Sequence, residues 1–280
     1  MKKKFSTILI VLLFLISLSL LTYPYIANQW NLYRNERLIS KYSKEVSTQE
    51  EDYSKYWQMA QEYNRSLVQN SLTDSFNSNT ATSQDDTYNS CLNLLNDGIM
   101  GYIDIPKIEV TIPIYHTTQE EVLQKGVGHL QGSSLPVGGE GTHSVLAGHR
   151  GLPNYALFTD LDLLQVGDYF TLHILDDILC YQVDQIVTVE PQDTSNLAIV
   201  KGMDYVTLLT CTPYGVNTQR LLVRGHRVPY TSEVENTITD NTIGSVSLYT
   251  NYLFWIVLGV TITIVFAIVL TTLERKRNRR

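Results

Sequence analysis

Residues 204–228 read DYVTLLTCTPYGVNTQRLLVRGHRV and indicate two strands joined by a short connection. Both halves are rich in Val, Leu and Thr, whereas the stretch Thr212–Asn217 contains Pro and Gly and is typical of a turn. In such a hairpin the end of the first strand lies beside the start of the second. We therefore expect Cys211 and Arg220 to be neighbours at one end of the pair.

The chain from Gly98 onward repeats this pattern of short strands. Closely spaced β-branched and apolar runs with turn residues between them are typical of an antiparallel barrel or sandwich. Two short helical stretches are expected near Thr118–Lys125 and Ala156–Leu164. The runs are GYIDIP, VTIPIY, THSVLAGH, DYFTLHIL, LCYQVDQIVTVE, DYVTLLTC and QRLLVRGHRV.

Cys211 has two interpretations. A thiol at a strand end, partly exposed and beside a cation, suits nucleophilic chemistry, whereas a buried thiol acts as a small apolar side chain. The second interpretation fits Cys91 and Cys180. The chain has three cysteines, so an extracytoplasmic domain keeps at least one free thiol. No C-x-x-C motif or His/Cys cluster with metal-ligand spacing is present.

Arg220 and a histidine are the candidate partners of this thiol. A guanidinium can stabilise a thiolate and donate hydrogen bonds to a developing oxyanion, although a solvated strand-end arginine is the alternative. Of the six histidines, His149 lies next to Gly148 and near Gly151, which let the backbone turn and present the ring. His143 lies further inside the same strand and is expected to be structural. A cysteine, a histidine and a cation together can perform acyl transfer.

These motifs resemble the sortase family. Residues 207–211, TLLTC, match its TLxTC signature, Arg220 falls where the family has its catalytic arginine, and residues 147–151, AGHRG, resemble its histidine segment. Residues 125–153 and 204–227 are similar to class C, the pilus-assembling sortases. The likeness covers about residues 98–230. It implies a mainly β fold, a closed sortase-type β-barrel with short helices, preceded by a helical and lid segment and flanked by two transmembrane helices.

Class C sortases commonly carry a lid with an Asp-Pro-aromatic motif. The nearest match here is Asp74-Ser75-Phe76, in which serine replaces proline. The resemblance implies that Asp74 pairs with Arg220 and that Phe76 covers the thiol. The alternative is a linker, because residues 71–90 are rich in Ser, Thr, Asn and Asp.

The resemblance also implies a mechanism of two acyl transfers. Cys211 attacks the Thr–Gly carbonyl of an LPxTG-like sorting signal, His149 protonates the departing amine, and Arg220 holds the oxyanion. A lysine of another pilin subunit then attacks the thioacyl enzyme, and His149 takes its proton. The implied partners are pilins or surface proteins with C-terminal sorting signals, and no metal or organic cofactor is implied.

Three alternatives stay open at this point. A housekeeping sortase would transfer the acyl group to a cell-wall precursor. A cysteine protease would use similar groups for hydrolysis, so transfer to an added amine separates the two. An anchored adhesin or assembly scaffold would keep its function after Cys211→Ala.

Two apolar segments point to a membrane. Residues 5–23 and 252–273 carry no charge, and each is close to the ~20 residues that a spanning helix needs. A cleavable signal peptide is the alternative for the first segment, and a buried core helix for the second. Basic residues precede the first segment and follow the second, so both termini are expected in the cytoplasm. The catalytic domain would then lie outside the cell membrane of a Gram-positive-type cell.

The outer part of the chain is acidic. Without Lys2–Lys4 and the residues after 273 it has 13 basic and 27 acidic residues, a net charge near −14. This charge argues against nucleic acid as a ligand. The expected order is a cytoplasmic N-terminus (1–4), a transmembrane helix (5–25), a helical and lid segment (26–97), the catalytic barrel (98–230), a polar tether (231–249), a transmembrane helix (250–273) and a basic cytoplasmic tail (274–280).

Overall fold

The computed structural model of the chain describes residues 2–48, 52–67, 86–240 and 254–264. The chain divides into two compact units. The first consists of Met1–Trp30, Pro153–Tyr155 and Val246–Arg280, and the second of Asn31–Leu152 and Ala156–Ser245. The barrel belongs to the second unit.

The first unit is helical over most of its described length. Helix α1 spans Lys2–Thr48 and continues through Pro24, and its part up to Trp30 belongs to this unit. Leu12–Thr48 is the one helix in the described residues that is long and apolar enough to cross a membrane, a test that a signal sequence also passes. Phe254–Ile264 is a shorter apolar helix, and the rest of the expected second span lies outside the described residues. The two-span topology therefore stays a prediction.

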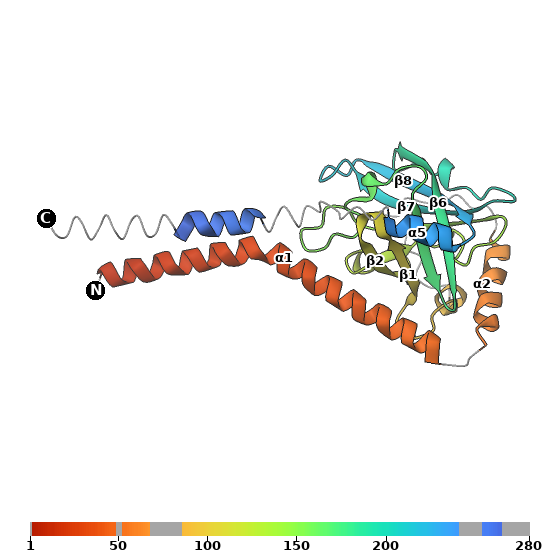
Figure 1. The fold of residues 1–280 in the computed structure, drawn as a ribbon, viewed down its shortest axis with the longest axis horizontal. Helices are drawn as coiled ribbons and strands as arrows, with labels where there is room; N and C mark the ends of the chain where they lie inside the picture. The colour runs from red at the N-terminus through yellow and green to blue at the C-terminus, as the bar shows by residue number, and fades with distance from the viewer. Residues whose placement is uncertain (1, 49–51, 68–85, 241–253, 265–280) are drawn as a thin grey trace. The chain divides into compact units, whose positions relative to one another are not determined.

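The second unit is built around a closed barrel, which confirms the fold class expected from the sequence (Figure 1). The strands follow the order β1-β2-β3-β4-β7-β8-β6-β5 around the barrel. Their bounds are β1 Ile99–Ile105, β2 Val110–His116, β3 Val127–His129, β4 Thr142–Ala147, β5 Tyr169–Ile174, β6 Asp177–Val189, β7 Asp204–Thr212 and β8 Gln219–Val228.

Most neighbouring strands are antiparallel, with two exceptions. β2 pairs with β3 in parallel, and β4 pairs with β7 in parallel. The β4–β7 pair brings two strands together that are far apart in sequence, with their carboxyl ends at the same rim of the barrel. β7 and β8 form the antiparallel hairpin that the sequence predicts.

Short helices connect the strands. A helix near Thr118–Lys125 is present as α4 (Glu120–Leu123), but Ala156–Leu164 contains only the 3₁₀ turn η3 (Leu161–Leu163). This 3₁₀ helix is the short helical stretch expected near Ala156–Leu164, and it begins after Leu157, whose φ of 40° lies outside the right-handed helical region. The other short elements are η2 (Pro106–Ile108), η4 (Ser195–Leu197) and, after the barrel, α5 (Ser232–Asp240).

The polar N-terminal region is helical over most of its described residues. The later part of α1 packs on the barrel through Tyr42, whose hydroxyl donates to Met100 O at 3.1 Å and accepts from Leu175 N at 2.8 Å. Asn64 attaches helix α2 (Ser54–Ser66) to the segment between β3 and β4. Its carboxamide makes two hydrogen bonds with the backbone of Leu135. A further helix, α3 (Asp86–Ser90), precedes β1.

One apolar cluster packs the short helix α4 against β4, β7 and β8, below the rim at which β4 and β7 end. It joins α4 to three neighbouring strands, so the short helix and the strand ends are packed as one body. Its buried members are Leu123, Leu130, Val145, Ala147, Leu197, Leu209 and Leu222.

Candidate active site

Cys211 and Arg220 lie directly opposite each other on β7 and β8. The connection between them contains Gly215 and Asn217 with φ values of 72° and 60°, a conformation that Gly and Asn adopt at low cost. Each of the two residues is 8% exposed, so Cys211 is buried rather than partly exposed as its strand-end position predicted. The hairpin thus brings the thiol and the guanidinium together at the barrel rim, as the sequence led us to expect.

The guanidinium of Arg220 is held over the connection that follows Cys211. Its NH1 atom donates to the carbonyl oxygens of Asn217 at 3.2 Å and of Gln219 at 3.1 Å. A buried arginine held in this way has a defined orientation, which a hydrogen-bond donor for a short-lived oxyanion needs.

His149 reaches the same rim from β4. The last residue pair of the parallel β4–β7 ladder is Ala147 with Leu209, and Gly148 N donates onward to Leu209 O at 3.0 Å. His149 is two residues beyond Ala147, and Cys211 is two residues beyond Leu209. Because residues on paired parallel strands stay in register, His149 and Cys211 lie side by side at the ends of these adjacent strands.

Glycine is required on the N-terminal side of this histidine. A Cβ at Gly148 would lie 2.7 Å from the ring of Phe158, a buried side chain that packs against the backbone there. Phe158 N also donates to His149 O at 3.1 Å. The absence of a side chain at 148 therefore lets Phe158 support the turn that presents the histidine.

Arg150 connects the histidine turn to the cysteine loop, a contact that the sequence analysis did not anticipate. Its NH1 donates to Thr212 Oγ1 at 3.3 Å, and its NH2 pairs with Asp162 at 2.5 Å. Its guanidinium also lies 5.9 Å from the ring centre of Tyr214. The only sequence signal was that Arg150 follows His149 directly.

The side chain of His149 is 19% exposed and lies next to a carboxylate. Its Nε2 atom is 3.3 Å from Oε1 of Glu120, the first residue of α4. Sequence reasoning missed this contact, because 29 residues separate the two and nothing in the local pattern marks Glu120.

Two other histidines, His143 and His129, are buried in strands of the barrel. His143 bonds Ala198 O at 2.9 Å and Thr207 Oγ1 at 2.7 Å, and burial lowers its pKa. His129 is fully buried, which lowers its pKa to about 4. These rings are neutral at physiological pH, which fits the structural role expected for His143.

The two other thiols lie in the interior. Cys91 and Cys180 are 1% and 0% exposed, and none of the three cysteines forms a disulfide. Burial raises the pKa of the Cys180 thiol to about 11, so it stays protonated at neutral pH. Both therefore match the structural interpretation of the sequence.

Two candidate residues are not among those that the structure describes. Asp74 and Phe76, the proposed lid residues, are outside the described residues, and their role stays a prediction. Among the residues that the structure describes, no group of three or more His, Cys, Asp or Glu side chains is placed to hold a metal ion.

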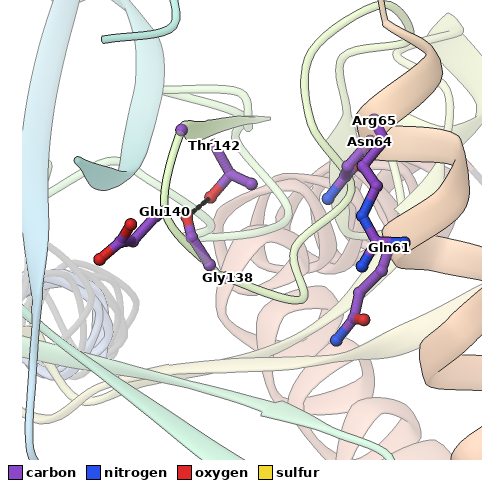
Figure 2. Close-up of a pocket in the computed structure, with 8 residues that line it drawn as sticks. Gln61, Asn64, Arg65, Gly138, Glu140 and Thr142 are labelled. Carbon is purple, nitrogen blue, oxygen red and sulfur yellow. Dashed lines mark hydrogen bonds between the residues drawn. The ribbon is translucent and has the colours of Figure 1, made fainter. Parts of the chain in front are cut away.

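A separate polar hollow of about 310 Å³ lies between α2 and the glycine-rich loop that leads into β4. Figure 2 shows Gln61, Asn64 and Arg65 on one side and Gly138 to Thr142 on the other. The hydroxyl of Thr142 donates to Gly139 O at 2.7 Å and closes this loop. Thr142 begins β4, and His149 follows its end, so roughly 20 Å of strand separates the hollow from the cysteine rim.

The comparisons with known proteins agree with this geometry. A family model for the sortase domain matches residues 103–228. Sortase D of Bacillus subtilis (strain 168) is 31% identical over 131 residues, and sortase A of Bacillus anthracis is 28% identical over 130 residues. Each match covers 46% of this chain, and the two cover 63% and 60% of those relatives. The chain thus matches only about three fifths of their length.

Solved structures match over a longer part of the chain. Sortase C1 from Streptococcus agalactiae is 54% identical with a TM-score of 0.63, and the match covers 70% of this chain and all of that one. Sortase C-1 from Streptococcus pneumoniae is 45% identical with a TM-score of 0.65, again covering 70% of this chain and all of that one. The identity to these class C structures exceeds that to the two Bacillus relatives.

Proposed function

This chain belongs to the sortase family, whose members are cysteine transpeptidases, and we propose that it is a membrane-anchored enzyme of the class C kind that links pilin subunits. The observation that carries the proposal is the convergence of Cys211, Arg220 and His149 at one barrel rim. Identities of 45–54% to class C structures support the choice of class.

In the first half-reaction the Cys211 thiolate attacks the Thr–Gly carbonyl of an LPxTG-like sorting signal. The C–N bond breaks as the thioester forms, and His149 gives a proton to the departing glycine amine. Arg220 donates hydrogen bonds to the oxyanion of the tetrahedral intermediate, a role often worth about 3 kcal/mol. The hydrogen bonds of Arg220 NH1 to the carbonyl oxygens of Asn217 and Gln219 support this role, because they orient the guanidinium.

In the second half-reaction an amine replaces water as the nucleophile. His149 takes a proton from the ε-amine of a lysine on another pilin subunit, and the amine attacks the thioester. An isopeptide bond forms as the C–S bond breaks, and Cys211 is returned. Repetition of this cycle yields a covalent polymer.

We also propose that the chain is anchored in the membrane with its barrel outside and both termini in the cytoplasm. The apolar part of α1 supports one span. The uncharged residues 252–273 and the basic residues at both termini support a second span and the orientation.

The test is polymerisation. The chain in detergent is incubated with a pilin that carries a C-terminal sorting signal, and SDS-resistant ladders are sought by gel electrophoresis. Ladders are expected with the parent and are expected to be absent with Cys211→Ala. Transfer to a peptide that mimics a cell-wall precursor, without ladders, would instead indicate a housekeeping sortase. Hydrolysis alone in the presence of amine would indicate a protease.

A further inference from the structure

Glu120 is the carboxylate that contacts the proposed general acid and base. Its Oε1 atom lies 3.3 Å from Nε2 of His149, at the long end of hydrogen-bonding distances. Such contacts are often long in a resting enzyme and shorten when substrate binds. Since a carboxylate only accepts, this contact requires the imidazole proton to be on Nε2.

The position of Glu120 is fixed despite the 60% exposure of its side chain. Gln124 Nε2 donates to the same Oε1 atom at 2.9 Å, which holds the carboxylate from the next turn. Leu123 is buried in the apolar cluster that includes Ala147 and Leu209, the last residue pair of the β4–β7 ladder. The helix is therefore anchored to the same strands that carry His149 and Cys211.

A polar contact this exposed contributes little to the stability of the fold. The contact matters instead for which ring nitrogen of His149 carries the proton. In Cys/His and Ser/His enzymes, a third group that bonds one ring nitrogen selects the tautomer and leaves the other nitrogen to exchange the proton.

We propose that Glu120 is a positioning residue for His149. Its carboxylate keeps a proton on Nε2, so that Nδ1 is the nitrogen that exchanges protons with the thiol and the amines. The kinetic part of this inference rests on the proposed transpeptidase function, whereas the tautomer of His149 does not.

The chain offers a matched control for this proposal. Glu121 is the next residue of the same helix, is also acidic and exposed, and forms no hydrogen bond or ion pair with His149. Glu121→Ala removes the same charge from the first turn of α4. Glu120→Gln removes the charge of Glu120 but keeps an oxygen that accepts a hydrogen bond from Nε2.

The primary measurement is the tautomer of His149 in the full chain in detergent, from the ¹⁵N chemical shifts of ¹⁵N-labelled histidine rings. The His149 signals are assigned by their loss in His149→Asn. The neutral ring is expected as the Nε2–H tautomer in the parent, in Glu120→Gln and in Glu121→Ala. In Glu120→Ala a substantial Nδ1–H population is expected. An unchanged tautomer in Glu120→Ala would overturn the proposal.

The second measurement is the rate of acyl transfer from a sorting-signal peptide to an added amine. Glu120→Ala is expected to lower this rate about tenfold or more, a part of the 10²–10⁴ that general acid–base catalysis contributes. Glu120→Gln should recover part of the loss, and Glu121→Ala should match the parent. Equal rates in Glu120→Ala and Glu121→Ala would overturn the catalytic part. A parent chain that forms no thioacyl enzyme would contradict the proposed function, and the tautomer alone would then decide the role of Glu120.

Discussion

Cys211 and Arg220 are Cα partners across the antiparallel pair β7–β8, with six residues of chain in the connection between the two strands. Directly opposed residues of an antiparallel pair project to the same side of the sheet. The hairpin therefore places Cys211 and Arg220 at opposed positions on one face of the sheet without any contribution from distant parts of the chain. The parallel pairing of β4 with β7 then adds His149 from a different region of the sequence.

Arg220→Lys is expected to be a severe substitution. Lysine keeps the charge but lacks the planar fork of N–H donors that can hold an oxyanion. The rate of thioacyl formation, measured in a single turnover with a sorting-signal peptide, should fall about 10²-fold or more.

Arg224→Lys is the matched control on the same strand. Arg224 pairs with Asp184 at 2.9 Å, away from the rim, and its substitution should leave the single-turnover rate within about threefold of the parent. A near-parental rate in Arg220→Lys would assign that arginine to a structural role in the β7–β8 connection.

Gly148→Ala is expected to destabilise the barrel through a clash with Phe158. The new Cβ would lie 2.7–3.1 Å from three ring atoms of that buried side chain. Overpacking of this kind costs about 1–3 kcal/mol of the free energy of unfolding, measured by urea unfolding of the chain in detergent. In a Phe158→Leu background the same substitution should cost less, since the ring is gone. An equal cost in both backgrounds would disprove the clash.

Acidification is expected to destabilise the barrel through His129. Its folded pKa is about 4 and its unfolded value about 6.5, so between these values the unfolded chain binds more protons. Above pH 6.5 His129 is neutral in both the folded and the unfolded chain and does not lower the free energy of unfolding. As the pH falls from 6.5 toward 4, this residue lowers the free energy of unfolding by up to about 3 kcal/mol. In His129→Asn, the free energy of unfolding should vary less steeply between pH 6.5 and 4. The same pH dependence in parent and variant would rule out this residue as a source.

The β7–β8 hairpin could be predicted from the sequence because its determinants are local. Two apolar runs and a Pro- and Gly-containing turn are enough to pair Cys211 with Arg220. The position of His149 was inferred from its glycine neighbours and from the family resemblance. The parallel β4–β7 pairing that places it beside Cys211 depends on the whole barrel, which no local pattern reveals.

Other features were missed for related reasons. The strand β3 has only three residues, Val127–His129, too few for an alternating pattern to be recognised. The contact of Glu120 with His149 and the link from Arg150 to Thr212 join segments that are distant in sequence. Both depend on tertiary packing, so neither residue could be distinguished from ordinary surface charges.

The most direct test of the account is the identity of the acylated residue. The chain in detergent is mixed with a sorting-signal peptide, and the intact protein mass is measured before any amine is added. The parent and Cys180→Ala are expected to gain the mass of the acyl fragment ending in threonine, and Cys211→Ala is expected to gain nothing. An adduct of that mass on Cys211→Ala would contradict the assignment of Cys211 as the nucleophile.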